Sequence, residues 1–308
     1  KGKPTMGEFI LWVLQNIALA PYHLFLAIIN PQDWLFWGNR EALVRFIYYG
    51  GSVEFFFVTF TIFAIITALG MAWRRAILWW GVRVLETFAN AVGRFFAWAG
   101  LLMVLQQVMI VFLQRIFRVA EIQLGPFGNA FVQDLSWWGE ELKLYNAMVV
   151  CLCVTYTFVQ GGHVRVDLVY SAVKYRTKRI IDMVGCLFFM VPAVIIIYLY
   201  AWFFMWRHLV VPNPSATSDL DRMLMQARVL RWNVETIGFS PNGFNAYFLF
   251  KVLLVAFCVL VFLQAVAFFW RSYLEWREGE ESAGKYLDKD VLGDEAEDLA
   301  HTAHSGAT

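Results

Sequence analysis

The residues of this chain that could carry chemistry gather in one short stretch, QGGHVRVDLVY, which runs from Gln160 to Tyr170. His163, Arg165 and Asp167 lie there among valines, directly after an apolar run long enough to cross a membrane. An imidazole, a guanidinium and a carboxylate at this spacing could form a ligand site. They could equally anchor a helix at the edge of a bilayer, where basic side chains contact anionic headgroups. The elements around the stretch are needed to choose between these interpretations.

Histidine pairs are a second possible site, because two facing imidazoles inside a helical bundle can ligate a haem iron. Of the five histidines, His301 and His304 lie in the C-terminal tail. His163 and His208 are expected at opposite faces of the membrane, which leaves His23 alone inside a predicted span. A haem or quinone anchor of a redox complex is therefore the less favoured alternative.

The sequence lacks the motifs that are typical of hydrolytic enzymes and of metal sites. The sequence has no GxSxG, HExxH, glycine-rich phosphate loop or CxxC motif. Its four cysteines all lie in apolar runs and are expected to be buried thiols. We therefore expect neither an enzyme nor a bound cofactor or metal.

A transport site in mid-membrane would need broken helices, or ionisable side chains that face a cavity. The candidates in the apolar runs are the amides of Asn16, Gln106, Gln107 and Gln264, together with Pro192. Amides of this kind more often form hydrogen bonds between helices than bind a substrate, and a proline can kink a helix without forming a site. The sequence therefore shows no evident permeation path.

Composition indicates an integral membrane protein. Of 308 residues, 60% are hydrophobic and 16% are charged, against about 45–50% and about 25% in soluble domains. Basic residues do not cluster on a soluble face, so we expect no nucleic-acid partner. A crossing of about 30 Å takes about 20 apolar residues. The segments that satisfy this length are 8–29, 52–73, 95–117, 142–160, 180–206 and 246–270. They predict an all-α protein with six transmembrane helices.

Charges in the loops predict the orientation of these helices. Lys and Arg are enriched around 74–94 and 165–179, which by the positive-inside rule places both termini in the cytoplasm. From Val164 onward, valines recur on one helical stripe, so an interfacial amphipathic helix is expected after the fourth span. We interpret QGGHVRVDLVY as the start of this cytoplasmic elbow. Its anchoring side chains are expected to be Arg165, Asp167, Lys174, Arg176, Lys178 and Arg179.

The stretch EELKLYNAMVVCLCVTYTFVQGGHVRVDLVY resembles the signature of the small membrane subunit of TRAP (tripartite ATP-independent periplasmic) transporters. In that family a Glu opens the second family helix, which ends in a Gly-x-His-hydrophobic-x-Val-Asp pattern. Glu141, Gly161, His163 and Asp167 fill these places.

The segment that precedes and includes the last span, ETIGFSPNGFNAYFLFKVLLVAFCVLVFLQAVA, resembles the end of the same family. There a Ser-Pro pair precedes a helix with an early Lys and a late Gln. The corresponding residues are Ser240, Pro241, Lys251 and Gln264.

The resemblance implies a four-helix family core, 95–277, preceded by a two-helix membrane extension, 1–94. The acidic composition of the rest, 278–308, separately predicts a disordered cytoplasmic tail. The extension and a long outer loop after His208 depart from compact family members.

The resemblance also implies a function. A small subunit of this family supports a large membrane subunit, which carries the substrate and sodium sites in a symporter of the bacterial inner membrane. A periplasmic binding protein delivers the organic acid, often a carboxylate. The partners implied are these two proteins and membrane lipids, with Arg222, Arg228 and Arg231 of the outer loop as possible binding-protein contacts. A structural subunit of another membrane assembly stays an alternative.

Overall fold

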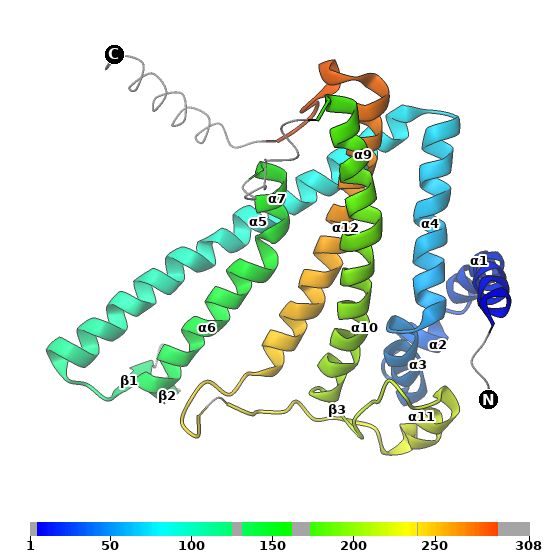
Figure 1. The fold of residues 1–308 in the computed structure, drawn as a ribbon. Helices are drawn as coiled ribbons and strands as arrows, with labels where there is room; N and C mark the ends of the chain where they lie inside the picture. Colours follow the sequence, from blue (N-terminus) through cyan, green and yellow to red (C-terminus); the bar gives the residue numbers. More distant parts are fainter. Residues whose placement is uncertain (1–4, 125–130, 162–172, 239, 289–308) are drawn as a thin grey trace, which may run out of the picture.

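The computed structural model is a largely helical chain, drawn as a ribbon in Figure 1. Most long helices run up and down in this view, and the short strands lie at the lower end. The expected helical architecture is confirmed. The described residues are 5–124, 131–161, 173–238 and 240–288.

Side-chain caps define where the N-terminal helices begin. These helices are α1 (Met6–Ile29), α2 (Gln32–Leu35), α3 (Arg40–Gly50) and α4 (Val53–Ala72). Thr5 and Glu8 form a capping box at the start of α1. The side chains of Asn39 and Ser52 each accept a backbone N–H at the starts of α3 and α4.

The other long helices form continuous or bent rods. They are α5 (Arg75–Phe112), α6 (Leu135–Leu152), α7 (Val154–Gln160), α9 (Tyr175–Gly185), α10 (Val191–Arg207) and α12 (Phe248–Glu278). A π-helical turn extends α5 to Phe117, and another, Cys186–Met190, joins α9 and α10 into a rod of 33 residues. α6 and α7 meet at Cys153 with a bend of 44°. At 1.5 Å per residue, such rods are long enough to cross a bilayer.

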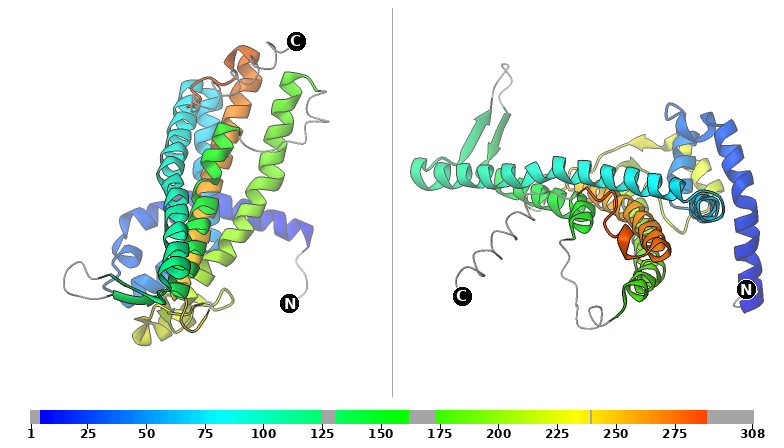
Figure 2. Two further views of the ribbon diagram at one scale, coloured as in Figure 1. Left: turned by 90° about the vertical axis from the view of Figure 1, so that its left-hand side faces the viewer. Right: turned by 90° about the horizontal axis from the view of Figure 1, so that it is seen from above.

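Five helices of the described part are long and apolar enough to cross a membrane, or up to six if α6 and α7 form one bent span. All six expected segments are helical, which supports a membrane-embedded protein. Figure 2 (left), however, shows α1 lying across the other helices rather than along them. The number of six crossings therefore stays a prediction.

α12 is the enclosed helix of the molecule. Half of its apolar window is buried inside the protein, whereas the share is 6–11% in α1, α4, the α5 rod and the α9–α10 rod. α12 packs against α5, α6, α9 and α10. Seen from above, α5 and α6 extend to one side of it, and α4 and α1 lie on the other (Figure 2). The helices therefore form an open arrangement around α12.

Two expected loops differ in the structure. The basic connection expected at 74–94 is helical, because α5 begins at Arg75 directly after the turn that ends α4. The boundary expected between 94 and 95 thus lies inside α5, although the division into three parts stays a prediction. Residues 162–172 of the expected elbow lie outside the described residues. From Tyr175 onward the elbow belongs to the α9–α10 rod and not to a separate surface helix.

The strands and a short helix form a layer at the lower end. β1 (Glu121–Leu124) pairs antiparallel with β2 (Phe131–Asp134), and β3 (Val210–Val211) pairs with β4 (Arg231–Trp232). The short helix α11 (Leu220–Gln226) lies beside α3.

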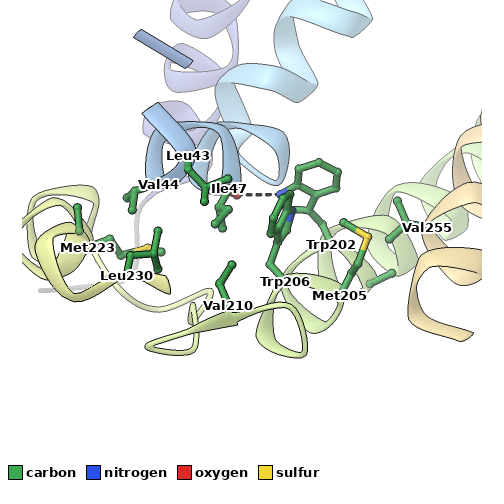
Figure 3. Packing of buried hydrophobic residues seen from close by; sticks show 12 residues of the cluster. Leu43, Val44, Ile47, Trp202, Met205, Trp206, Val210, Met223, Leu230 and Val255 are labelled. Atoms are coloured by element: carbon green, nitrogen blue, oxygen red, sulfur yellow. Dashed lines mark hydrogen bonds between the residues drawn. The ribbon is translucent and has the colours of Figure 1, made fainter. Parts of the chain in front are cut away.

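An apolar cluster connects this layer to α3 and α10 (Figure 3). Ile47, Trp206 and Val210 lie at its centre, and the Trp202 indole donates a hydrogen bond of 2.8 Å to the Ile47 carbonyl. A Cβ on Gly50 would lie 2.1 Å from the Trp202 ring, so only glycine permits this approach of α3 to α10.

Candidate functional site

Buried charges form the most distinctive side-chain cluster of the described residues, at the upper end of Figure 1. Glu86 on α5 and Arg271 and Glu275 on α12 are 3%, 7% and 1% exposed. The Arg271 Nε donates to Glu86 Oε1 over 2.7 Å, and its Nη1 lies 3.5 Å from Glu275 Oε1. Buried charges need partners and hydrogen bonds to offset their lost hydration. This cluster therefore connects α5 to α12 through paired charges.

Arg179 extends the cluster to α9. Its guanidinium lies 2.6 Å from Glu275 Oε2 and 3.2 Å from Asp182 Oδ2, and the Tyr175 hydroxyl donates to Glu275 over 3.2 Å. Sequence reasoning placed Arg179 among the lipid anchors. The structure instead turns its side chain inward, where it pairs with a carboxylate of another helix.

The segment after α12 crosses over this cluster, and we call residues 279–288 the C-terminal strap. Both Arg94 terminal nitrogens donate to the Asp288 carboxylate, over 3.0 and 3.1 Å. The Asn90 amide donates to the Asp288 carbonyl over 2.8 Å, and the Gln160 amide donates to the same carbonyl over 3.0 Å. The tail was expected to be disordered from residue 278, but up to Asp288 it has defined contacts. The rest, 289–308, lies outside the described residues.

Paired charges of this kind stabilise a fold and do not provide a general base. Each carboxylate of the cluster already accepts hydrogen bonds from an arginine. Sequence reasoning missed Glu86, Arg271 and Glu275. A signal was present, because Glu86 follows the apolar Leu78 and Val82 at helical spacing and is therefore expected on the same face of the helix. A charge on such a face indicates a buried partner.

The family-motif residues fall at both ends of the molecule. Gly161 ends α7 with a φ of +77°, which glycine adopts without strain. Lys174 is the N-cap of α9, where Arg176 is exposed and Lys178 is half-buried. His163, Arg165 and Asp167 lie outside the described residues.

Glu141 lies towards the other end of the molecule, on α6. The Gln106 amide donates to Glu141 Oε2 over 3.1 Å and to the Trp138 carbonyl over 3.0 Å. Of the amides in the apolar runs, Gln106 thus forms the hydrogen bond between helices that is expected of such residues. Glu141 thus connects α6 to α5.

The motif residues in and before the last helix do not lie together. Ser240 and Pro241 line an open polar cavity of about 780 Å³, between the first strand pair and the loop before α12. The Lys251 ammonium lies 5.0 Å from the centre of the Tyr247 ring, a cation–π distance. Gln264 is buried on α12, and its Oε1 has no hydrogen-bond partner among the described residues. The structure does not bring these residues together with Glu141 into one site.

The outer-loop arginines share one surface at the lower end. Arg222 lies on α11, Arg228 follows it in a 3₁₀ turn, and Arg231 lies on β4. All three are exposed, and the Arg228 carbonyl accepts a hydrogen bond from Arg40. This surface rests on the apolar cluster of Figure 3, which packs it against α3 and α10.

Histidines do not converge in the described part of the chain. His23 lies on the crosswise α1, whereas His208 pairs closely with Glu235 at the lower end. Within the described ranges no three His, Cys, Asp or Glu side chains are grouped to hold a metal ion.

Comparisons with family models, with curated proteins and with solved structures found no match.

Proposed function

We propose that the chain is the small scaffold subunit of a TRAP-type, ion-coupled organic-acid uptake transporter of the bacterial inner membrane. In this role it would support a large carrier subunit and help to dock a periplasmic binding protein. The proposal joins the family resemblance of residues 95–277 to the open arrangement of the helices.

The observation that carries the proposal is that α12 is much more deeply buried inside the protein than the other long apolar helices are. A carrier that moves its own substrate needs a site enclosed between several helices near mid-membrane. Here half of the apolar window of α12 is buried, against 6–11% of the windows of α1, α4, the α5 rod and the α9–α10 rod. Charged side chains of the described cluster lie towards the helix ends, as Arg271 does on α12. This arrangement is more typical of a static scaffold subunit than of a subunit that carries the substrate across the membrane.

The exposed face of α5 supports the same role. Phe95, Trp98, Leu102, Leu105 and Phe112 are all exposed along this helix. In a membrane, an apolar face of this size contacts either lipid or another membrane-embedded chain. We propose that the large subunit covers part of it.

Under this proposal the upper end of Figure 1 faces the cytoplasm, and the lower end faces the periplasm. The lower end then presents Arg222, Arg228 and Arg231 to the binding protein. Exposed arginines of this kind can speed association with an acidic partner by electrostatic steering.

Co-purification tests the proposal most directly. A tagged full-length chain, extracted in mild detergent from its native membranes, is expected to bring down a larger and more hydrophobic protein in constant ratio. The pair, but not the chain alone, should accumulate an organic acid in liposomes when a sodium gradient and the binding protein are supplied.

Two results would contradict this role. Accumulation of a solute by the isolated chain would make it a carrier. A Soret band in the purified protein, or a constant redox partner, would favour the haem or quinone anchor instead.

A further inference from the structure

We infer that a groove beside α4 binds an anionic phospholipid, with an acyl chain in the groove and the headgroup at its upper end. The inference concerns this chain alone and does not depend on the transporter role. We call the space between α4, α10 and α12 the α4 groove. Its lining includes Phe56, Ala64, Ala68, Pro192, Ile195 and Val266.

The groove is apolar along its length. The main part has a volume of about 680 Å³, and a second part of about 240 Å³ shares Phe56, Phe63 and Phe262 with it. The second part reaches Ser52, which caps the lower end of α4, and the main part reaches Met71 near the upper end. The groove therefore follows α4 over most of a bilayer crossing.

Several polar groups in the lining are already satisfied by the protein. The Trp270 indole donates to Thr67 Oγ1 over 2.8 Å, and Thr67 donates to the Phe63 carbonyl over 2.6 Å. The Cys186 thiol donates to the Ala265 carbonyl over 3.1 Å. An occupant of the main part therefore needs no hydrogen bonds to these groups, which favours hydrocarbon over a polar ligand.

The size of the groove favours an acyl chain over a protein helix. The main part, about 680 Å³, falls within the range of about 300–1,000 Å³ that is typical of small-molecule pockets. A single chain of methylene groups is thin and flexible enough to fill such a space.

Basic residues flank the upper end of the groove. Arg74 and Arg75 follow α4 three and four residues after the groove-lining Met71, and both are exposed. Basic residues beside the cytoplasmic end of a membrane helix attract phosphate-bearing headgroups.

The acidic groups nearby do not oppose this assignment. Asp182 and Glu275, at the same end, both contact the guanidinium of Arg179. Glu280 and Glu281 are exposed as well, but they follow the groove-lining Trp270 by ten or more residues, whereas Arg74 and Arg75 follow Met71 by three and four. The two arginines are therefore the charges available to an anionic headgroup.

Native mass spectrometry of the delipidated full-length chain tests the inference. Phosphatidylglycerol and phosphatidylcholine with identical acyl chains are added in turn, and the fraction of bound protein is measured. We expect tighter binding of phosphatidylglycerol. Arg74→Gln with Arg75→Gln should lower that affinity about fivefold for each cation removed, since each contributes about 1 kcal/mol near an anionic lipid. Arg222→Gln with Arg228→Gln, at the opposite end, is the matched control.

A second variant tests the groove itself. Ala68 lines the groove and is exposed, so Ala68→Trp should fill the space and reduce binding at least fivefold. Leu69→Trp, one residue along the same helix and outside the lining, should bind as the unaltered chain does. Equal affinity for both lipids, or unchanged binding in Ala68→Trp, would overturn the inference. A dimer that binds no lipid and is lost in Ala68→Trp would identify a second copy as the occupant, and would also overturn it.

Discussion

Arg271 on α12 and Glu86 on α5 face each other across the helix interface, and the Arg271 Nε donates to Glu86 Oε1 over 2.7 Å. Both side chains are buried, and the two residues are 185 positions apart in the sequence. A pair of this kind specifies how α5 meets α12, because separating the two helices differently would leave a buried charge without its partner.

Loss of one member of this pair should be costly. We expect Arg271→Met to destabilise the protein by about 3–5 kcal/mol, because it leaves Glu86 buried and uncompensated. The measurement is the unfolding transition of the purified protein in detergent. Glu275 keeps Arg179 as its partner in this variant, at 2.6 Å.

The double variant Glu86→Leu with Arg271→Met provides the control. It removes both charges and replaces them with apolar groups, so most of the lost stability should return. If the double variant were as unstable as Arg271→Met alone, the cost would arise from packing and not from the unpaired charge.

Glycine at position 93 is expected to determine how closely α5 approaches α7. A Cβ built there would lie 2.1 Å from the Cβ of Tyr156, an atom that cannot move without the helix. Gly93→Ala should therefore force the helices apart and cost about 1–3 kcal/mol. Gly100, on the same helix, has its nearest atom at 3.9 Å, so Gly100→Ala should be neutral or stabilising by up to about 1 kcal/mol. Equal unfolding transitions for the two variants would show that the approach at Gly93 is not tight.

The helical segments were predictable from the sequence because each is a long apolar run. The start of α5 was not, since Arg83, Glu86 and Arg94 interrupt the hydropathy and suggest a loop. These charges are tolerated in a helix because each has an interaction partner. Glu86 pairs with Arg271 and Arg94 pairs with Asp288. The guanidinium of Arg83 lies over the Tyr286 ring. Every one of these partners comes from a distant part of the chain, which periodicity alone cannot identify.

The crosswise direction of α1 was also beyond sequence reasoning. Its 24 residues are apolar enough to cross a membrane. Its direction depends on contacts with α4, such as the edge-on packing of Trp12 against Phe57 at 5.7 Å. Length and composition therefore predict that a helix forms, and tertiary contacts decide where its axis points.

The C-terminal strap should be released by acid. The two hydrogen bonds from Arg94, and then that from Asn90, hold the pKa of Asp288 below its usual value. A carboxyl whose pKa is lowered by folding adds stability above its unfolded pKa, and this stability is lost as the pH falls through the lowered value. Protection of the amides of residues 279–288 from hydrogen exchange, measured relative to the intrinsic exchange rate at each pH, should therefore fall below about pH 4, the ordinary pKa of aspartate.

Asp288→Asn is the matched variant for this effect. It keeps the shape of the side chain but removes the titrating group, so protection of the strap should be lower at neutral pH and nearly independent of pH. Strap protection that depends on pH equally in both proteins would assign the effect to another group.

The outer surface formed by Arg222, Arg228 and Arg231 supplies the prediction closest to function. If this surface contacts the binding protein, replacing all three arginines with Ala should slow association, and the effect should be largest at low salt, because exposed charges act mainly by steering. Uptake by the assembled transporter should fall, while co-purification with the large subunit stays unchanged. Arg115→Ala removes an exposed arginine at the far end of the α5 rod, and it should leave association unaffected. Uptake that is unchanged in the triple variant would exclude these three residues from docking. A loss of the large subunit in the same variant would mean that the surface belongs to the membrane complex instead.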